Sequence, residues 1–396
     1  MVLPKHKSLS EANPSREWFH SFGLRFDPYV HLEASSDPNL AEYILDLEIF
    51  RAAWDKEPTI IFAPPGGGKT ATRVAVTRTC WFDMGGIYPF PLPYNVGITP
   101  LTGMPPSRSQ HYQFLLEAGS CALLTGLAFR PERLLRASKA DIRAINRLLR
   151  AGLPGSLDYY LAVLRETGSP AGLTRLLERT YALTTPPSAE MVNQFCVALG
   201  VNTDDISELS SSTPDDLFYL FVKLVTDTLG FSHVLVLVDG IDAISEHQSH
   251  FDRGLQWIIS LLDSAAQWPD AKVIVKYFLP NSMEPIITSY LQRQSVSMRL
   301  LHIVWTADRL VELLQKRILA ASDGRFESLD AISAPELIDV ESRIVRALPL
   351  LPRAALQVTR HALQQASDQL EEVHLRQAIL WYRSHMSGYL ANINSS

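Results

Sequence analysis

The chain has 396 residues, of which 46% are hydrophobic and 9% aromatic, so it is long enough to bury a large core in about two or three units. Lysine and arginine number 36 against 42 aspartate and glutamate, and the net charge of −6 excludes a wholesale nucleic-acid coat while leaving local basic patches open. The three cysteines are far apart and have no neighbouring histidine cluster, which indicates neither a disulfide framework nor a zinc site. The first residues lack the apolar core of a secretory leader, and no stretch reaches the roughly 18 apolar residues of a membrane span, so we expect a cytoplasmic protein with no membrane segment.

The N-terminal third is expected to lead into a strand, a glycine-rich loop and a helix. Residues 1–57 begin polar and then show a helical apolar period over Leu40–Trp54. Thr59–Ala63 is a β-branched and aromatic run that ends in a Pro/Gly cluster, and the residues after that cluster have the composition of a helix. These residues open the first part of a core, 58–110, which continues through an irregular Pro/Gly-rich stretch with a short strand at Tyr94–Thr99.

The rest of the sequence alternates between helical blocks and apolar strands. Residues 111–230 carry helical patterns separated by Gly, Pro and Ser, and we expect them to form a helical insertion. The core resumes over 231–306, beginning with a near-continuous apolar run that is typical of a strand buried on both faces of a parallel sheet. Residues 307–396 are helical throughout and are expected to form a C-terminal lid. The pattern predicts an α/β fold with a doubly wound, mainly parallel sheet.

The strongest chemical signal is the loop sequence Ala-Pro-Pro-Gly-Gly-Gly-Lys-Thr, which ends at Thr70. A triphosphate needs converging backbone N–H groups and a cation that reaches between the phosphates. The glycines open the backbone, Lys69 supplies the cation, and Thr70 offers a hydroxyl to Mg²⁺ at the start of a helix. We therefore expect ATP with Mg²⁺ to bind here; an ordinary Pro/Gly-rich turn is the alternative. The expected cradle consists of Pro65, Gly66, Gly67, Gly68, Lys69, Thr70 and Ala71.

A second acidic motif follows the apolar run of the resumed core. Asp239 stands where a strand buried on both faces is expected to end, and an aspartate at that place in a phosphate-loop protein orients Mg²⁺ and its water. The expected metal ligands are therefore Thr70 and Asp239. The alternative is an ordinary core strand that ends in an Asp-Gly turn.

The sequence Asp239-Gly240-Ile241-Asp242 resembles the STAND and NACHT branch of the P-loop NTPases, which are relatives of the AAA+ proteins. The pattern in that branch usually reads D-G-x-D-E, and this chain has Ala243 at the last acid. The resemblance spans roughly 40–80 and 230–365. It implies that Asp242 positions the attacking water, a role needed only for hydrolysis. The departure at Ala243 bears on the efficiency of hydrolysis and leaves binding untouched.

The same resemblance implies further residues around the terminal phosphate. A polar sensor after the next strand would be Lys276 or Asn281. An arginine finger near the end of the following helix would be Arg293. The C-terminal pair Pro352-Arg353 resembles a lid helix whose arginine approaches the γ-phosphate through a charge-assisted hydrogen bond. The alternative for both arginines is a solvated place on a helix surface.

One helix of the expected insertion carries a basic face. Lys139, Arg143, Arg147 and Arg150 follow one another at helical spacing, and apolar residues occupy another face of the same helix. Such a stripe can follow a nucleic-acid backbone or dock an acidic partner. A solvated helix face is the common alternative.

These signals favour an ATP-driven regulatory switch, in which bound ATP clamps the core against the lid and recruits further copies of the chain or a regulatory protein partner. Such a switch would cycle between ATP and ADP as an ATPase. A nucleic-acid-associated ATPase of AAA+ type is the first alternative, and a scaffold that keeps ATP without cleaving it is the second. A small-molecule kinase is disfavoured by the long insertion between the two motifs.

Overall fold

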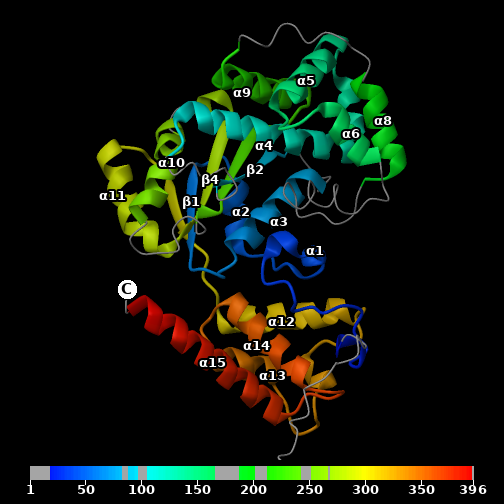
Figure 1. Cartoon of the computed structure of the whole chain (residues 1–396), viewed down its shortest axis with the longest axis vertical. Coiled ribbons are helices and arrows are strands. Elements are labelled where there is room, and N and C mark those ends of the chain that lie inside the picture. The colour runs from blue at the N-terminus through cyan, green and yellow to red at the C-terminus, as the bar shows by residue number, and fades with distance from the viewer. Residues whose placement is uncertain are drawn as a thin grey trace, which may run out of the picture. The chain divides into compact units, whose positions relative to one another are not determined.

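The computed structural model forms two compact units (Figure 1). The sheet unit is Glu33–Val304, and the helical unit combines the chain up to Leu32 with the chain from Trp305 onward. The N-terminal segment expected over 1–57 is thus divided between the two units. The residues that the structure describes are 18–82, 88–96, 105–165, 187–200, 212–241, 251–265 and 268–394.

A five-stranded sheet in the order β2-β3-β4-β1-β5 forms the centre of the sheet unit, and all its pairings are parallel. Every residue of β1, β3 and β4 is buried, which explains the near-continuous apolar sequence of these strands. The prediction of an α/β fold with a parallel sheet is confirmed. The strands are β1 (Thr59–Ala63), β2 (Phe90–Asn95), β3 (Val234–Asp239), β4 (Val273–Pro280) and β5 (Arg299–His302).

β2 begins earlier than the strand expected at Tyr94–Thr99, and it includes two prolines. Pro91 and Pro93 lie two residues apart, so their missing N–H positions fall on the same side of the strand. Among the described strands, β2 is at the edge of the sheet and pairs with β3, and an edge strand tolerates proline on its unpaired side. The strand therefore begins four residues before the predicted start at Tyr94.

Helices cover both faces of the sheet. The connection from β1 to β2 crosses the sheet in one direction, and the connections after β2, β3 and β4 cross it in the other. Right-handed crossovers therefore place α3 on one face and α4, α10 and α11 on the opposite face. In agreement, α3 contacts β1 to β4, while α4 contacts β2 and α10. These helices are α3 (Lys69–Phe82), α4 (Arg108–Phe129), α10 (Phe251–Ala265) and α11 (Glu284–Gln294).

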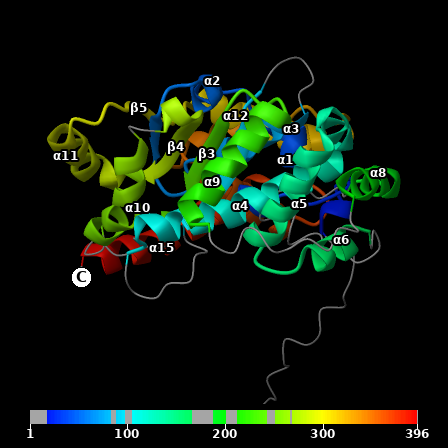
Figure 2. The ribbon, with the colours of Figure 1, turned by 90° about the horizontal axis from the view of Figure 1, so that it is seen from above.

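The long helix α4 is the core of the helical insertion and lies beside α9 (Figure 2). A side chain at Gly119 would come within 2.8 Å of Phe221, so glycine allows the two helices to approach. α4 is apolar and long enough to cross a membrane, but 67% of its apolar window is buried inside the protein, as in a core helix. α4 contacts α5 (Lys139–Gly152), α8 (Ala189–Leu199) and α9 (Pro214–Lys223), and α6 (Leu157–Arg165) contacts α8.

The single helix expected over Leu40–Trp54 is two short helices, α1 (Leu40–Tyr43) and α2 (Glu48–Trp54). The backbone is extended at Ile44, and the segment between the helices buries Leu45. Burial of this side chain outweighs the local helical preference, which is worth only a few tenths of a kcal/mol per residue, about 0–0.7.

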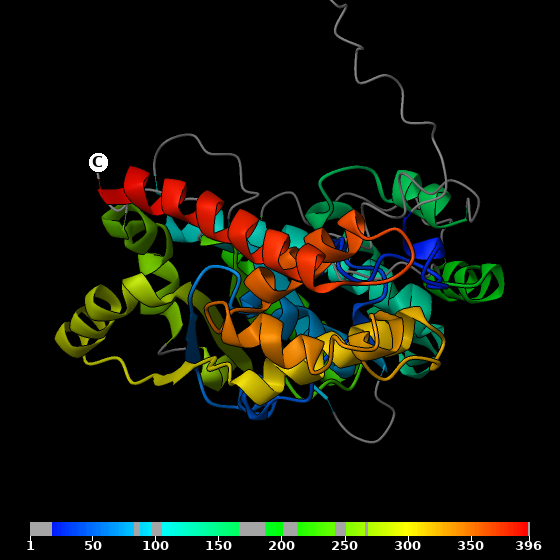
Figure 3. The ribbon, with the colours of Figure 1, turned by 90° about the horizontal axis from the view of Figure 1, so that it is seen from below.

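The helical unit is built from α12 (Ala307–Ala321), α13 (Val340–Arg346), α14 (Pro352–Gln365) and α15 (Glu372–Asn394). α14 packs against the other three helices, and α15 runs alongside it (Figure 3). The N-terminal stretch joins this unit through polar contacts. Arg360 Nε lies 2.8 Å from Asp27 Oδ2, and Arg317 donates to the carbonyl of Pro28. These contacts explain why the described residues before Glu33 belong to this unit.

Lys276 fixes the amino end of the sheet. Its side chain is fully buried in the middle of β4, and its ammonium donates to the carbonyls of Ala52 at 2.8 Å and Glu57 at 2.7 Å. It also contacts Asp55 and the hydroxyl of Thr59. Burial lowers the pKa of Lys276, while the hydrogen bond and charge of Asp55 act in the opposite direction. The lysine thus connects the end of α2 to the start of β1.

We expect Lys276→Ala to lower the free energy of unfolding by about 3 kcal/mol, because it leaves buried carbonyls unpaired and removes the partner of Asp55. Urea unfolding followed by tryptophan fluorescence measures this loss. Lys272→Ala is the matched control, since its ion pair with Asp227 is about half exposed and should contribute less than about 1 kcal/mol. Equal losses in the two variants would contradict this role of Lys276.

Candidate nucleotide-binding site

The candidate site lies at the carboxyl edge of the sheet, where β1 and β4 end side by side. The last residue of β1, Ala63, pairs with the last residue of β4, Pro280. The helices that follow these two strands go to opposite faces, which makes this edge a topological switch point. In open α/β sheets, ligands bind in the crevice at such a point. The glycine-rich loop leaves β1 there.

The loop has a backbone that only glycine accommodates. Gly66 and Gly68 have φ angles of 74° and 96°, in the left-handed region that side chains disfavour. Gly67 donates its N–H to the carbonyl of Pro64 at 2.9 Å, and a Cβ on Gly67 would lie 2.9 Å from that same oxygen. α3 begins directly after the loop and continues for 14 residues. An open backbone at a helix N-terminus suits an anionic group.

Lys69 is buried at the first position of α3 and turns back over the loop. Its ammonium donates to the carbonyl of Ala63 at 3.0 Å and to that of Pro64 at 3.3 Å. These carbonyls hold the lysine at the mouth of the loop. A phosphate oxygen offers the same ammonium a stronger, charged acceptor.

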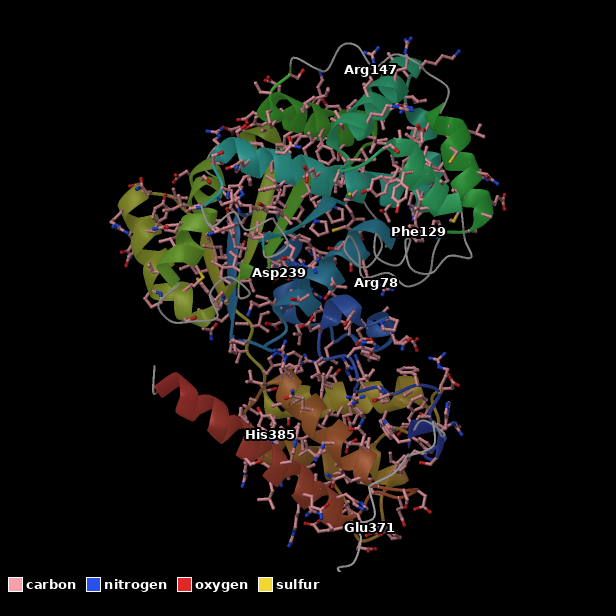
Figure 4. All side chains as sticks on the ribbon, in the orientation of Figure 1. Arg78, Phe129, Arg147, Asp239, Glu371 and His385 are labelled. Atoms are coloured by element: carbon pink, nitrogen blue, oxygen red, sulfur yellow. The ribbon has the colours of Figure 1, made fainter. Side chains whose placement is uncertain are left out.

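The two motifs predicted from the sequence meet at Asp239. Thr70 Oγ1 donates to Asp239 Oδ2 at 2.9 Å, across a sequence separation of 169 residues. Arg73 Nε donates to the same oxygen at 3.0 Å, and the N–H of Gly240 donates to Oδ1 at 2.8 Å. Asp239 lies at the end of β3 next to α3 (Figure 4). The side chains of Asp239 and Arg73 are each only 6% exposed.

Arg73 is a residue that sequence analysis missed. The signal was present, because a residue three places after Thr70 on a helix lies on the same face. The sequence shows the spacing, but only the structure shows which strand end that face meets.

The donor set at Thr70 and Asp239 fits Mg²⁺. A hydroxyl and a carboxylate oxygen are the hard oxygen ligands that this ion takes, and Mg²⁺ is commonly held by one or two protein groups together with substrate phosphates. Within the part of the chain that the structure describes, no cluster of three or more His, Cys, Asp or Glu could hold a metal by itself. Thr70 and Asp239 would hold the ion, which would supply charge neutralisation for the phosphates.

The remaining predicted residues are spread more widely. Asp242 lies outside the described residues. Asn281 follows β4 directly and is exposed at the same edge as the loop. Lys276 pairs with Thr59, the first residue of β1, so it lies at the opposite edge, and its prediction as a sensor is wrong.

Of the two predicted arginines, Arg293 lies in the sheet unit and Arg353 lies in the helical unit. α11 begins after the carboxyl end of β4 and ends before the amino end of β5, so Arg293 is near the edge opposite the loop. It is exposed, and its Nε donates to the carbonyl of Ser289. Arg353 belongs to the helical unit, where it is exposed in the first turn of α14.

The basic stripe on α5 is partly paired within the chain. Arg150 Nε donates to Asn146 at 2.9 Å, and its guanidinium lies 3.7 Å from Asp158. Arg147, labelled in Figure 4, is half-buried, whereas Lys139 and Arg143 are exposed. The charge offered to an outside polyanion is therefore smaller than the sequence spacing indicates. The nucleic-acid alternative stays a prediction.

We expect Gly67→Ala to destabilise the sheet unit by about 1–3 kcal/mol, because the new methyl group would meet a backbone oxygen that can move only with the loop. Thermal or urea unfolding measures the effect. Gly155→Ala is the control, since its Cβ would meet only Tyr160 at an ordinary 3.5 Å, and that change should stay within about 1 kcal/mol. A Gly67 variant as stable as the Gly155 variant would show that the loop has room for a side chain.

Comparison with known proteins adds no relative to this geometry, because no family model, no curated protein and no solved structure matches the chain.

Proposed function

We propose that this chain binds ATP with Mg²⁺ in the loop from Pro65 to Ala71. The observation that carries the proposal is the 2.9 Å hydrogen bond between Thr70 and Asp239. It joins a hydroxyl at the start of α3 to a carboxylate at the end of β3, at the point where the glycine loop leaves the sheet. An ordinary Pro/Gly-rich turn has no reason to bring these two groups together.

The charges around the loop support a polyphosphate as the ligand. Lys69 is a cation held over the loop, and the N-terminus of α3 adds the partial positive charge of a helix end. The glycines leave no side chain between these groups and a ligand. A triphosphate with a divalent cation matches this combination of a cation, open N–H groups and a hydroxyl–carboxylate pair.

We further propose that ATP hydrolysis by the isolated chain is slow. Asp242 would position the attacking water by its resemblance to the STAND pattern, and Ala243 removes the neighbouring acid. Arg293 lies toward the edge opposite the loop, so an arginine finger from this residue would serve a second copy of the chain. This placement favours a switch that works through self-association over an independent enzyme.

The regulatory part of the proposal rests on the resemblance and on the division of the chain. Arg353 belongs to a different compact unit from the loop, and a lid arginine of this kind would sense the γ-phosphate. ATP and ADP would then favour different states of the protein, which is the condition for a nucleotide switch. A cytoplasmic location is part of this proposal and agrees with the three cysteines, Cys80, Cys121 and Cys196, none of which is in a disulfide bond.

Removal of the Lys69 ammonium tests the binding site. A lost charged hydrogen bond costs about 1.5–3 kcal/mol, so Lys69→Ala should weaken ATP binding by roughly 10- to 150-fold in calorimetry. Lys272→Ala removes the same charge at the amino end of β4 and should leave the affinity unchanged. Equal affinities of the parent and Lys69→Ala for ATP would refute the nucleotide site.

The molecular mass in solution tests the switch. We expect ATP with Mg²⁺, but not ADP, to shift the 44.3 kDa chain to a higher mass by light scattering. Asp242→Asn should prolong the ATP-bound assembly if this residue serves hydrolysis. An identical mass with ATP, with ADP and without nucleotide would leave an ATP-binding scaffold. A shift that requires DNA or RNA would favour the nucleic-acid alternative.

A further inference from the structure

Arg73 places a permanent positive charge beside the carboxylate of Asp239, which is expected to bind the metal. Its Nε lies 3.0 Å from Asp239 Oδ2, and both side chains are only 6% exposed. The guanidinium group is always protonated in proteins. Because it lies on the same helix face as Thr70, it approaches the oxygen that also accepts the Thr70 hydroxyl. The two donors therefore share one acceptor.

This arrangement satisfies Asp239 before any ligand is bound. Oδ2 accepts from Thr70 and Arg73, and Oδ1 accepts from the Gly240 N–H. The guanidinium neutralises the negative charge that would attract a divalent cation. Since the pair is shielded from water, its interaction is screened less than that of an exposed pair. Binding of Mg²⁺ at Thr70 and Asp239 requires either that Arg73 moves or that two like charges become neighbours.

We infer that Arg73 opposes the metal at this site and thereby weakens the dependence of nucleotide binding on Mg²⁺. The inference rests on the proposed nucleotide site and deepens it, because it assigns a cation of the protein to the place that the metal would share. A purely structural role is the alternative: Arg73 would then hold Asp239 in position for the metal. The two roles predict opposite effects of removing the charge, since an opposing cation lowers the affinity for the metal and a positioning cation raises it.

The decisive quantity is the ratio of the ATP dissociation constant in EDTA to that in Mg²⁺. By linkage, this ratio measures how strongly the metal and the nucleotide support each other. A change that weakens ATP binding equally in both conditions cancels from it. Calorimetry or a fluorescent ATP analogue gives the ratio without reference to hydrolysis.

We expect the ratio to rise at least about fivefold in Arg73→Gln, because two like charges a few ångströms apart repel even at a high effective dielectric constant. Arg73→Lys keeps the charge and should keep the parental ratio. Arg78→Gln is the matched control: it removes an arginine that lies more than one turn beyond Arg73 on the same helix, and it should also keep the parental ratio.

Each outcome decides something. An unchanged or smaller ratio in Arg73→Gln overturns the inference and leaves the nucleotide site intact. A parent protein that binds no nucleotide in either condition overturns the proposed function and this inference with it. If Arg73→Gln does not fold, as judged by its melting curve, Arg73→Met keeps the length of the side chain and gives the same comparison. The parent also provides a test alone, because we expect its own ratio to stay below about tenfold, and a much larger value would contradict an opposing cation.

Discussion

The candidate site depends on the hydrogen bonds that the carboxylate of Asp239 accepts. This carboxylate is buried at the end of β3 and accepts hydrogen bonds from the loop helix and from its own following residue. An ionised carboxylate is costly to bury unless it is paired and hydrogen-bonded. Thr70 and Arg73 meet that requirement, so the polar contacts that hold α3 against the sheet are also those that assemble the site.

The order of the strands makes this contact possible. β3 and β1 are separated by β4, and α3 lies across all three strands. The parallel register brings their carboxyl ends to one edge, while the buried Lys276, in the middle of β4, connects that strand to the start of β1. The sheet is thus held by polar contacts at both edges and by apolar packing between them. A shift of β4 by one residue would disturb both sets of contacts, because a shift in register moves every side chain.

The proposed site would combine attraction for a polyphosphate with a restraint on the metal. Lys69 and the N-terminus of α3 favour negative charge, whereas Arg73 compensates Asp239 before a metal arrives. A nucleotide switch benefits from such a balance, since a ligand shifts an equilibrium only by its difference in affinity for the two states. Arg293 lies near the opposite end of the strands, as the proposed switch would require if a second copy of the chain completed the site.

Local sequence determined much of this protein. The parallel α/β fold followed from apolar runs buried on both faces, and the glycine loop followed from three consecutive glycines between a strand and a helix. The capping box at Thr213 and Asp216 likewise depends only on residues three apart in the sequence. Asp239 was identified because the end of its strand is visible in the apolar pattern of the sequence.

Tertiary structure decided the features that depend on distant neighbours. Pro91 and Pro93 belong to a strand because β2 is at the sheet edge, and the helix expected over Leu40–Trp54 is interrupted because Leu45 is buried. The sequence made Lys276 a candidate sensor, but its pairing with Thr59 places it beside the start of β1, away from the loop. In the sequence Arg73 is an ordinary helix residue, and only the packing of α3 against β3 shows that it contacts Asp239. Periodicity records which side of an element is buried, but the partner that buries it is chosen by the packing of the whole sheet.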